Sequence, residues 1–462
     1  MKIAMMTNNY KPFVGGVPIS VERLAQGLRL RGHEVCVFAP EYEGYEDDAG
    51  EDIVRYRSFA RCMKNGMVIP NVLDSKIREE FACRDFDLIH THHPMLIGNV
   101  AVRLSQRYQI PLVYTYHTRY EEYLHYLNPF SKKRENNAEH FLQNVCRRGL
   151  PCYMSAYMRK CSMIYAPSMD MKAFIERQSD SAMVQILPTG LEDSSYQPDQ
   201  EQAEKIRARY LDGKQYLFCT VSRLEQEKNL QFLFRSVQKM KQKIGDVFRM
   251  MVIGDGEERK DLESLARKLQ IQDTIRFVGK VPNYSVKNYL FASDAFLFAS
   301  LSETQGIVLA EAMAAGLPVI AVDACGVHDI VRNGKNGYLV EENEDEFAEQ
   351  VRMMMNHKEG YRKLKDGALH TADGYHMSCI AQKAEMDYRM MLERERSREY
   401  YGCQTGWKKD AESSLPFSRI TVCFDCYGIV SCHRPPVMKT YPEEPACSIM
   451  TERELPMRQN SA

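Results

Sequence analysis

DAFLFASLSETQGIVLAEAMAAGLPVIAV (residues 294–322) is the stretch that decides the fold. It reads as a short apolar strand at 294–300, an apolar helical segment that ends at Gly316, and a second apolar strand at 317–322. Strands this short and apolar, alternating with helices, are typical of a parallel sheet that is covered on both faces. The stretch therefore predicts an α/β protein.

The same alternation of strands and helices extends in both directions from this stretch. Six strand-like runs precede a polar segment at 192–200, and six follow it. They lie at 2–7, 33–40, 86–94, 111–118, 162–168 and 184–190, and then at 216–224, 248–256, 274–281, 294–300, 317–322 and 336–340. Two series of this kind predict two doubly wound, Rossmann-like domains that face a central cleft. Ligands of such sheets bind at the carboxyl ends of the strands, so we expect the site in that cleft.

The domain boundaries follow from these patterns. We expect an N-terminal Rossmann-like domain at 1–191, a linker at 192–200 and a second, C-terminal domain at 201–375. A polar helical pattern at 376–400 is expected to cross back to the first domain. Residues 401–462 form a tail that contains cysteine and proline and is expected to be poorly ordered.

Length and composition limit the class of protein. The chain has 462 residues and a mass of 53.4 kDa, which is more than one ordinary core accommodates. A net charge of −1 gives no general preference for nucleic acid. No signal peptide or membrane span is predicted, and 14 scattered cysteines favour reduced thiols in the cytosol.

The tail contains five of the 14 cysteines, and its sequence is compatible with two interpretations. Cys423 and Cys426, followed by Cys432 and His433, have spacing that suits zinc, but a second well-spaced pair is missing. The alternative is an extension without a metal.

Two glutamates in the opening stretch are the first candidate site residues. Glu303 lies just before the start of the helix, where Gln305 and Gly306 are expected to present free backbone N–H groups to an anion. Glu311 lies two turns into the helix. A phosphate flanked by two carboxylates that accept from hydroxyl groups describes a nucleotide sugar. The alternative is a solvated Glu303 and a Glu311 in a buried ion pair.

SRLEQEKN (222–229) adds two cations at the end of another strand. Arg223 and Lys228 are placed to stabilise the negative charge that builds on a leaving diphosphate. An ion pair of Lys228 with Glu225 or Glu227 is the alternative. Glycine turns at Gly15–Gly16 and at Gly254 permit close backbone approach to a phosphate, although each is a weak signal.

Jointly these motifs resemble those of retaining family-4 glycosyltransferases with two Rossmann-like domains. The resemblance extends over about residues 1–395 and adds YHT (116–118) and FVGKV (277–281) to the motifs above. It implies that Glu303 binds the donor sugar, Glu311 the ribose diol, and Arg223 and Lys228 the diphosphate. It also implies that Gly16 approaches the diphosphate and His117 the sugar. The remaining donor-side candidates are Gly15, Gly254, Val281, Gln305, Gly306 and Ile307.

The resemblance also bears on cofactors. No pair of carboxylates is arranged as nucleophile and acid, as expected for this family, in which the leaving phosphate is thought to accept the proton of the acceptor. Asp85 and Asp87 form a D-x-D sequence, which we interpret as the start of a strand. We therefore expect no essential metal or other cofactor.

The acceptor is suggested by YHTRYEEYLHYL (116–127), which resembles the subgroup that glucosylates diacylglycerol. Tyr120, Tyr123 and His125 would then line the acceptor side, whereas the alternative is an aromatic helix face in the core. Another lipid or a soluble sugar as acceptor, and a nucleotide-sugar epimerase or hydrolase on the same fold, remain rival functions.

A basic segment at 131–160 favours a lipid as the acceptor. It has seven basic residues against two acidic ones, with apolar residues between them. Such a segment suits an anionic membrane surface. Together with the resemblance, this segment leads us to expect a peripheral enzyme at the cytoplasmic face of the membrane. The resemblance implies a UDP-sugar, bound by the C-terminal domain, and a lipid acceptor, bound by the N-terminal domain, as partners, and no nucleic acid is expected.

Overall fold

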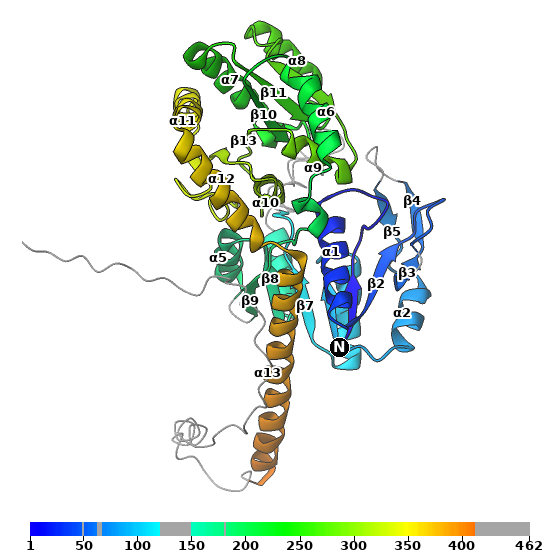
Figure 1. Ribbon diagram of the computed structural model, residues 1–462. Coiled ribbons are helices and arrows are strands. Elements are labelled where there is room, and N and C mark those ends of the chain that lie inside the picture. The colour runs from blue at the N-terminus through cyan, green and yellow to red at the C-terminus, as the bar shows by residue number, and fades with distance from the viewer. Residues whose placement is uncertain (49, 62–66, 121–148, 180–181, 412–462) are drawn as a thin grey trace, which may run out of the picture. The chain divides into compact units, whose positions relative to one another are not determined.

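The computed structural model describes residues 1–48, 50–61, 67–120, 149–179 and 182–411 (Figure 1). It divides into two compact units, Met1–Asp387 and Tyr388–Ala462. The first unit contains both sheets and all the site residues discussed below.

The first sheet has seven strands, and all of them run parallel. Its spatial order is β3 (Ile53–Tyr56), β2 (Glu34–Pro40), β1 (Lys2–Met6), β6 (Leu88–Thr91), β7 (Leu112–Thr115), β8 (Met163–Ala166) and β9 (Met183–Ile186). Its helices are α1 (Gly16–Leu30), α2 (Ser75–Ala82), α3 (Ile97–Tyr108) and α5 (Met169–Gln178). A separate antiparallel ribbon pairs β4 (Ser58–Arg61) with β5 (Val68–Pro70).

The second sheet has six parallel strands. Its order is β12 (Ile275–Gly279), β11 (Phe248–Ile253), β10 (Tyr216–Val221), β13 (Ala295–Phe298), β14 (Val319–Val322) and β15 (Gly337–Val340). Its helices are α6 (Gln200–Leu211), α7 (Leu230–Ile244), α8 (Arg259–Lys268), α9 (Asn283–Phe291), α10 (Ile307–Ala314), α11 (Glu344–Asn356) and α12 (Lys358–Asp373).

Side chains on neighbouring positions of β10 explain why the strand sequences are almost continuously apolar. Phe218 packs in a cluster with Leu233 of α7, and Leu217 and Cys219 pack in a second cluster with Leu309 of α10. Successive side chains of a strand point to opposite faces. The sheet is therefore covered on both faces, and the predicted α/β fold of two doubly wound sheets is confirmed.

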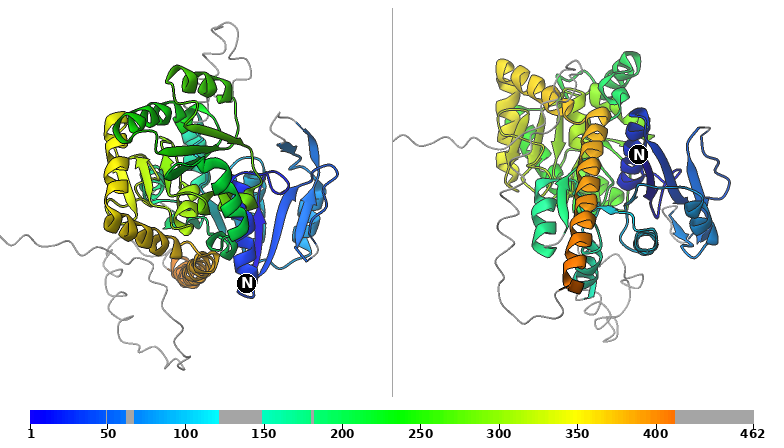
Figure 2. Two further views of the ribbon diagram at one scale, coloured as in Figure 1. Left: turned by 45° about the horizontal axis from the view of Figure 1, so that its top comes forward. Right: turned by 90° about the horizontal axis from the view of Figure 1, so that it is seen from below.

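The chain crosses between the two halves twice, and the two crossings lie side by side. Leu191 pairs with His376 in an isolated parallel bridge, and the Leu191 N–H donates to Tyr375 O at 2.6 Å. Two residues after Tyr375, the Met377 N–H donates to Leu191 O at 2.8 Å, and α13 (Met377–Ala411) begins. The first turns of α13 run along α1, where a Cβ on Gly27 would lie 2.8 Å from the Cβ of Ala381 (Figures 1 and 2).

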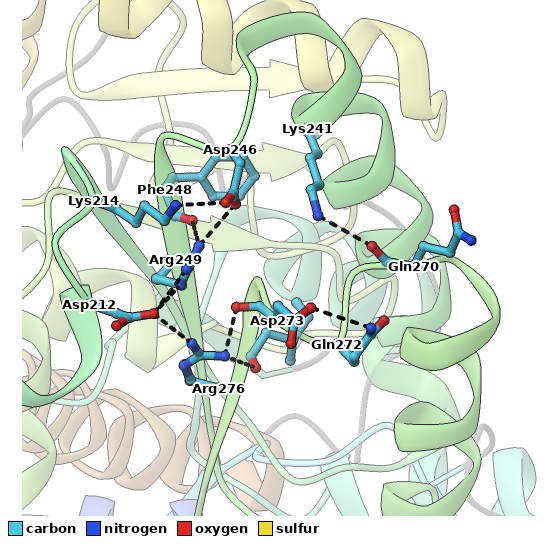
Figure 3. A network of polar contacts seen from close by, with 11 residues as sticks. Asp212, Lys214, Lys241, Asp246, Phe248, Arg249, Gln270, Gln272, Asp273 and Arg276 are labelled. Atoms are coloured by element: carbon cyan, nitrogen blue, oxygen red, sulfur yellow. Dashed lines mark hydrogen bonds and ion pairs between the residues drawn. The ribbon is translucent and has the colours of Figure 1, made fainter.

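A network of ion pairs and hydrogen bonds lies at the amino-terminal ends of the strands of the second sheet (Figure 3). Asp212, just after α6, accepts from Arg249 of β11 at 2.9 Å and from Arg276 of β12 at 3.1 Å. Arg249 also pairs with Asp246 at 3.0 Å. The network joins the starts of the neighbouring strands β11 and β12, so these charged residues have a structural role.

Within the described ranges, no helix combines the length and the apolar character that a membrane span requires.

Candidate active site

The candidate site lies where strands of both sheets end. His117 follows β7, Lys228 follows β10, and Glu303 follows β13. A cavity brings these segments together and is lined by His117, Thr118, Arg119, Lys228, Ser302, Glu303, Thr304 and Cys325. Its walls come from both halves of the chain, and three of the four residues predicted as catalytic line it.

Lys228 and Glu303 form an ion pair in this cavity. The Lys228 Nζ lies 2.8 Å from Glu303 Oε1, and the two side chains are only 13% and 17% exposed. Lys228 ends a short 3-10 turn (Gln226–Lys228), and Asn229 then adopts a left-handed conformation before α7 begins. The pair brings a cation and a carboxylate acceptor to one point, as a sugar bound through a diphosphate requires.

The residues between β13 and α10 are also bound to the first half. The Thr304 hydroxyl donates to His117 O at 3.0 Å. The Gln305 side chain accepts from the Thr189 N–H at 2.9 Å and donates to Thr189 O at 3.3 Å. Gln305 therefore uses its amide to hold the two halves together. Gly306 has φ +69°, and Ile307 starts α10.

Glu311 lies in a second cavity, together with a residue that the sequence did not indicate. The guanidinium of Arg23, from α1, approaches Glu311 Oε1 at 3.4 Å and donates to Gly190 O at 3.1 Å. Burial raises the pKa of Glu311, and the Arg23 charge acts in the opposite direction. The alternative considered above, a buried ion pair, thus describes Glu311 in this structure, and Arg23 and Glu311 both line the cavity.

Arg223 lies apart from the first cavity. Its side chain is 59% exposed and pairs with Glu225 and, at 3.2 Å, with Glu227. Burial and the neighbouring Glu227 raise the pKa of Glu225 to about 7. The acidic residues of the loop thus pair with Arg223, whereas Lys228 pairs with Glu303.

The predicted glycines have different surroundings. Gly15 is the extended residue before α1, and a Cβ on Gly16 would meet no atom within 4 Å. Gly254 has φ +132°, and a Cβ there would lie 1.9 Å from Ser222 O. Gly16 therefore leaves open space at the start of α1, whereas Gly254 is required by the backbone itself. Val281 is half-buried against the second sheet.

Two groups of predicted residues are placed elsewhere or lie outside the described residues. Tyr120 packs against the core of the first half, while Tyr123 and His125 lie outside the described ranges. Asp87 accepts from the Lys2 N–H at 2.7 Å, at the amino-terminal edge of the first sheet. In the described part of the chain, no group of three His, Cys, Asp or Glu side chains is arranged to hold a metal ion.

Two further histidines, His90 and His92, adjoin His117 and were not predicted as part of the site. His90 and His92 come from the end of β6, and their rings stack with centroids 4.3 Å apart. The His92 Nδ1 lies 2.9 Å from the His117 Nε2. Burial lowers the pKa of His90 to about 3 and those of His92 and His117 well below the usual value. The sequence signal for these histidines was HTHH (90–93) at a strand end.

Comparison with known proteins gives two adjoining family matches. Residues 14–195 match the model "Glycosyltransferase Family 4", and residues 201–370 match "Glycosyl transferases group 1". An alpha-monoglucosyldiacylglycerol synthase of Streptococcus pneumoniae is 28% identical over 342 residues, covering 70% of this chain and 71% of the relative. The enzyme of the same name from Acholeplasma laidlawii is 26% identical over 363 residues, covering 77% and 89%.

A third relative has a different name, and solved structures agree in fold. A glycosyltransferase of Bacillus subtilis named for teichuronic acid biosynthesis, TuaC, is 30% identical over 310 residues, covering 65% of this chain and 69% of TuaC. Sucrose-phosphate synthase from Thermosynechococcus elongatus superposes with a TM-score of 0.68 at 18% identity, over 85% of this chain and all of the other. Anabaena HepE in complex with UDP and glucose gives 0.64 at 19% identity, over 84% and 100%.

Proposed function

The chain belongs to the family-4 glycosyltransferases, and from this premise we propose that it transfers a hexose, glucose in the first instance, from a UDP-sugar to diacylglycerol with retention of configuration. The observation that carries the proposal is the Lys228–Glu303 pair in a cavity that His117 also lines. The pair supplies a cation for a diphosphate and an acceptor for sugar hydroxyls at the carboxyl ends of strands of the second sheet, and His117 follows a strand of the first.

Lys228 has the electrostatic task in this proposal. When the bond from the anomeric carbon to the diphosphate breaks, negative charge builds on the leaving oxygen, and a fixed cation in a water-poor site stabilises that charge. Glu303 accepts hydrogen bonds from the sugar hydroxyls and, at 2.8 Å, holds the Lys228 ammonium in place. The leaving phosphate takes the proton of the attacking hydroxyl, so no separate protein base is needed.

Glu311 has the task of binding the ribose. Its carboxylate is suited to accept from the two ribose hydroxyls, and Arg23 favours its ionised form. The nucleobase would lie near Val281 in the same cavity region, which Asn283 and Tyr284 help to line. Arg223 would have to leave Glu225 and Glu227 to reach the diphosphate, which its 59% exposure permits.

The lipid acceptor is supported by sequence similarity and by the charge of one segment. Two relatives carry the name alpha-monoglucosyldiacylglycerol synthase, and YHTRYEEYLHYL resembles that subgroup. The basic segment at 131–160, of which 149–160 is described, supplies charge for an anionic leaflet, so we place the enzyme at the cytoplasmic membrane surface. TuaC favours one alternative, which is transfer to a different acceptor by the same donor site.

Product analysis tests this proposal. The protein is incubated with UDP-glucose or UDP-galactose and with liposomes that contain diacylglycerol, with and without excess chelator. We expect an α-linked glucosyl lipid, since the donor is α-linked, and no loss of rate with chelator. A β-linked product contradicts retention, and a loss that added metal reverses contradicts the absence of a cofactor. A free epimerised UDP-sugar would identify an epimerase, and a soluble glycosylated product would refute the lipid acceptor only.

A further inference from the structure

His92 lies behind the cavity and makes one hydrogen bond through its ring. It is 1% exposed, and its Nδ1 lies 2.9 Å from the Nε2 of His117. The ring planes are inclined by only 22°, with centroids 5.2 Å apart. The backbone of His92 is fixed as well, because its N–H donates to Met6 O at 2.9 Å. The contact therefore joins two rings from neighbouring strand ends in a defined geometry.

A hydrogen bond between two neutral imidazoles has only two arrangements. Burial keeps both rings neutral at neutral pH, so each ring carries one proton. Either His117 Nε2–H donates to His92, or His92 Nδ1–H donates to His117. The first arrangement leaves the other nitrogen of His117, Nδ1, without a proton, and the second places a proton on it. The choice decides whether His117 accepts from a ligand or donates to it.

The unused nitrogen of His92 favours the second arrangement. Among the described residues, His92 Nε2 is buried and has no hydrogen-bond partner. In the first arrangement this atom would be a buried N–H without an acceptor, whereas in the second it is a bare nitrogen. Buried N–H groups without a partner are the rarer of the two cases in proteins. The neighbouring His93 is different, since its Nδ1 accepts from the Asn8 N–H at 3.1 Å.

We propose that His92 is a positioning residue that holds His117 as a neutral Nδ1–H donor toward the cavity. His117 lines the cavity beside Glu303, and its one ring hydrogen bond to a described residue is made through Nε2, which leaves Nδ1 for a ligand. A sugar hydroxyl is both donor and acceptor. The Glu303 carboxylate accepts a hydrogen bond from a sugar O–H, and the His117 Nδ1–H donates a hydrogen bond to a hydroxyl oxygen of the sugar. The identification of the ligand as a sugar rests on the proposed function, whereas the assignment of the His117 tautomer does not.

Nuclear magnetic resonance of ring-¹⁵N-labelled histidine in the full chain tests the tautomer directly. The signals of His117 are assigned by their loss in His117→Gln. We expect a protonated Nδ1 and a bare Nε2 in the parent, and a shift toward protonated Nε2 in His92→Leu. A bare Nδ1 in the parent overturns the proposal, whether or not the protein has transferase activity. A protonated Nδ1 in a protein that transfers no sugar overturns the proposed function alone.

Kinetics test the consequence for the donor sugar. His92→Leu should lower kcat about three- to tenfold, the loss expected for one neutral hydrogen bond, with little change in the KM for the acceptor. His92→Asn should recover most of this loss, because its Nδ2 replaces the Nδ1 donor. Both variants remove the ring, so their thermal midpoints should agree. If His92→Asn is as slow as His92→Leu at equal stability, His92 acts through packing and the proposal is wrong.

Discussion

At the scale of single residues, Lys228 and Glu303 form the contact on which the proposed chemistry depends. The sequence placed both at strand ends, and the structure brings them to 2.8 Å. The sequence alone could not indicate Arg23 or His92. Arg23 is one of several charged residues on an amphipathic helix, and the HTHH run is equally typical of a buried strand. Their roles depend on contacts with residues far apart in the chain, such as Glu311 and His117.

Glu303→Gln should lower kcat/KM about ten- to hundredfold, because a charged acceptor of sugar hydroxyls contributes roughly 1.5–3 kcal/mol. The measurement is initial rate against UDP-sugar concentration. Glu344→Gln is the matched control, since Glu344 forms an exposed ion pair with Arg235 on the surface of the second half. Equal rates for both variants would show that Glu303 does not bind the donor.

Arg223→Ala should cost at least as much activity as Glu303→Gln, if Arg223 leaves its acidic neighbours and binds the diphosphate when the donor is present. Glu225→Gln is its control, because it removes a partner of Arg223 without removing the cation. Rates near the parent value for Arg223→Ala would confine this arginine to the ion pairs seen here. Glu225 and Glu227 lie close in sequence to both Arg223 and Lys228. The sequence alone could therefore not predict with which cation each of these two carboxylates pairs.

At the scale of elements, the strands predicted best were those buried on both faces. Four-residue β3 (Ile53–Tyr56) was not predicted; it lies at the sheet edge and its sequence, IVRY, is too short an apolar run to be told from a loop. The ribbon of β4 and β5 was missed for a similar reason, since its strands have four and three residues. A continuous apolar run is the stronger signal.

The start of α1 gives a prediction that separates binding from stability. Gly16→Ala should leave the thermal midpoint unchanged or slightly raised, because a Cβ there meets no atom within 4 Å and alanine favours helix. It should weaken UDP binding about tenfold if the diphosphate approaches this backbone, measured by calorimetry. Gly254→Ala should instead destabilise the protein, owing to its φ of +132°. Unchanged UDP binding in Gly16→Ala would remove Gly16 from the site.

At the scale of the whole molecule, a titratable contact links the two halves. His328, in the loop after β14, lies 2.7 Å from Asp170 of α5 and 3.1 Å from Asp323. Burial lowers the pKa of His328, but its hydrogen bonds to the two aspartates outweigh this effect and raise it above 6.5. A raised histidine pKa stabilises the folded state fully below the unfolded pKa of about 6.5, and this contribution is lost as the pH rises through the higher folded value.

His328→Gln should therefore lower the thermal midpoint at pH 6 by roughly 1–3 °C and have little effect at pH 9, because the half-exposed pair is screened by solvent. Scanning calorimetry at the two pH values measures the difference. His370→Gln, an exposed histidine of α12, is the control. An equal loss at both pH values would mean that the charge on His328 does not matter.

Membrane binding also belongs to the whole molecule. Glutamine at five basic positions should strongly weaken binding to anionic liposomes in sedimentation, because each charge contributes about 1 kcal/mol near the surface and is screened by salt. The positions are Lys132, Lys133, Arg134, Arg147 and Arg148, and of the basic segment only 149–160 is described. A control replaces five lysines of the second half, Lys205, Lys239, Lys243, Lys260 and Lys363. Equal binding of the two variants would place the membrane contact elsewhere.

The adjoining crossings at Leu191 and His376 have a consequence for ancestry. Because the chain enters the second half beside the point where it leaves, residues 192–375 form an insertion whose two ends meet, bridged by the Leu191 and Met377 hydrogen bonds. Recombination could then replace this block in a single event, with the flanking backbone undisturbed. A lineage could in this way acquire a new sugar donor while it retains its old acceptor, and relatives with shared halves and different products are what such exchange would leave behind.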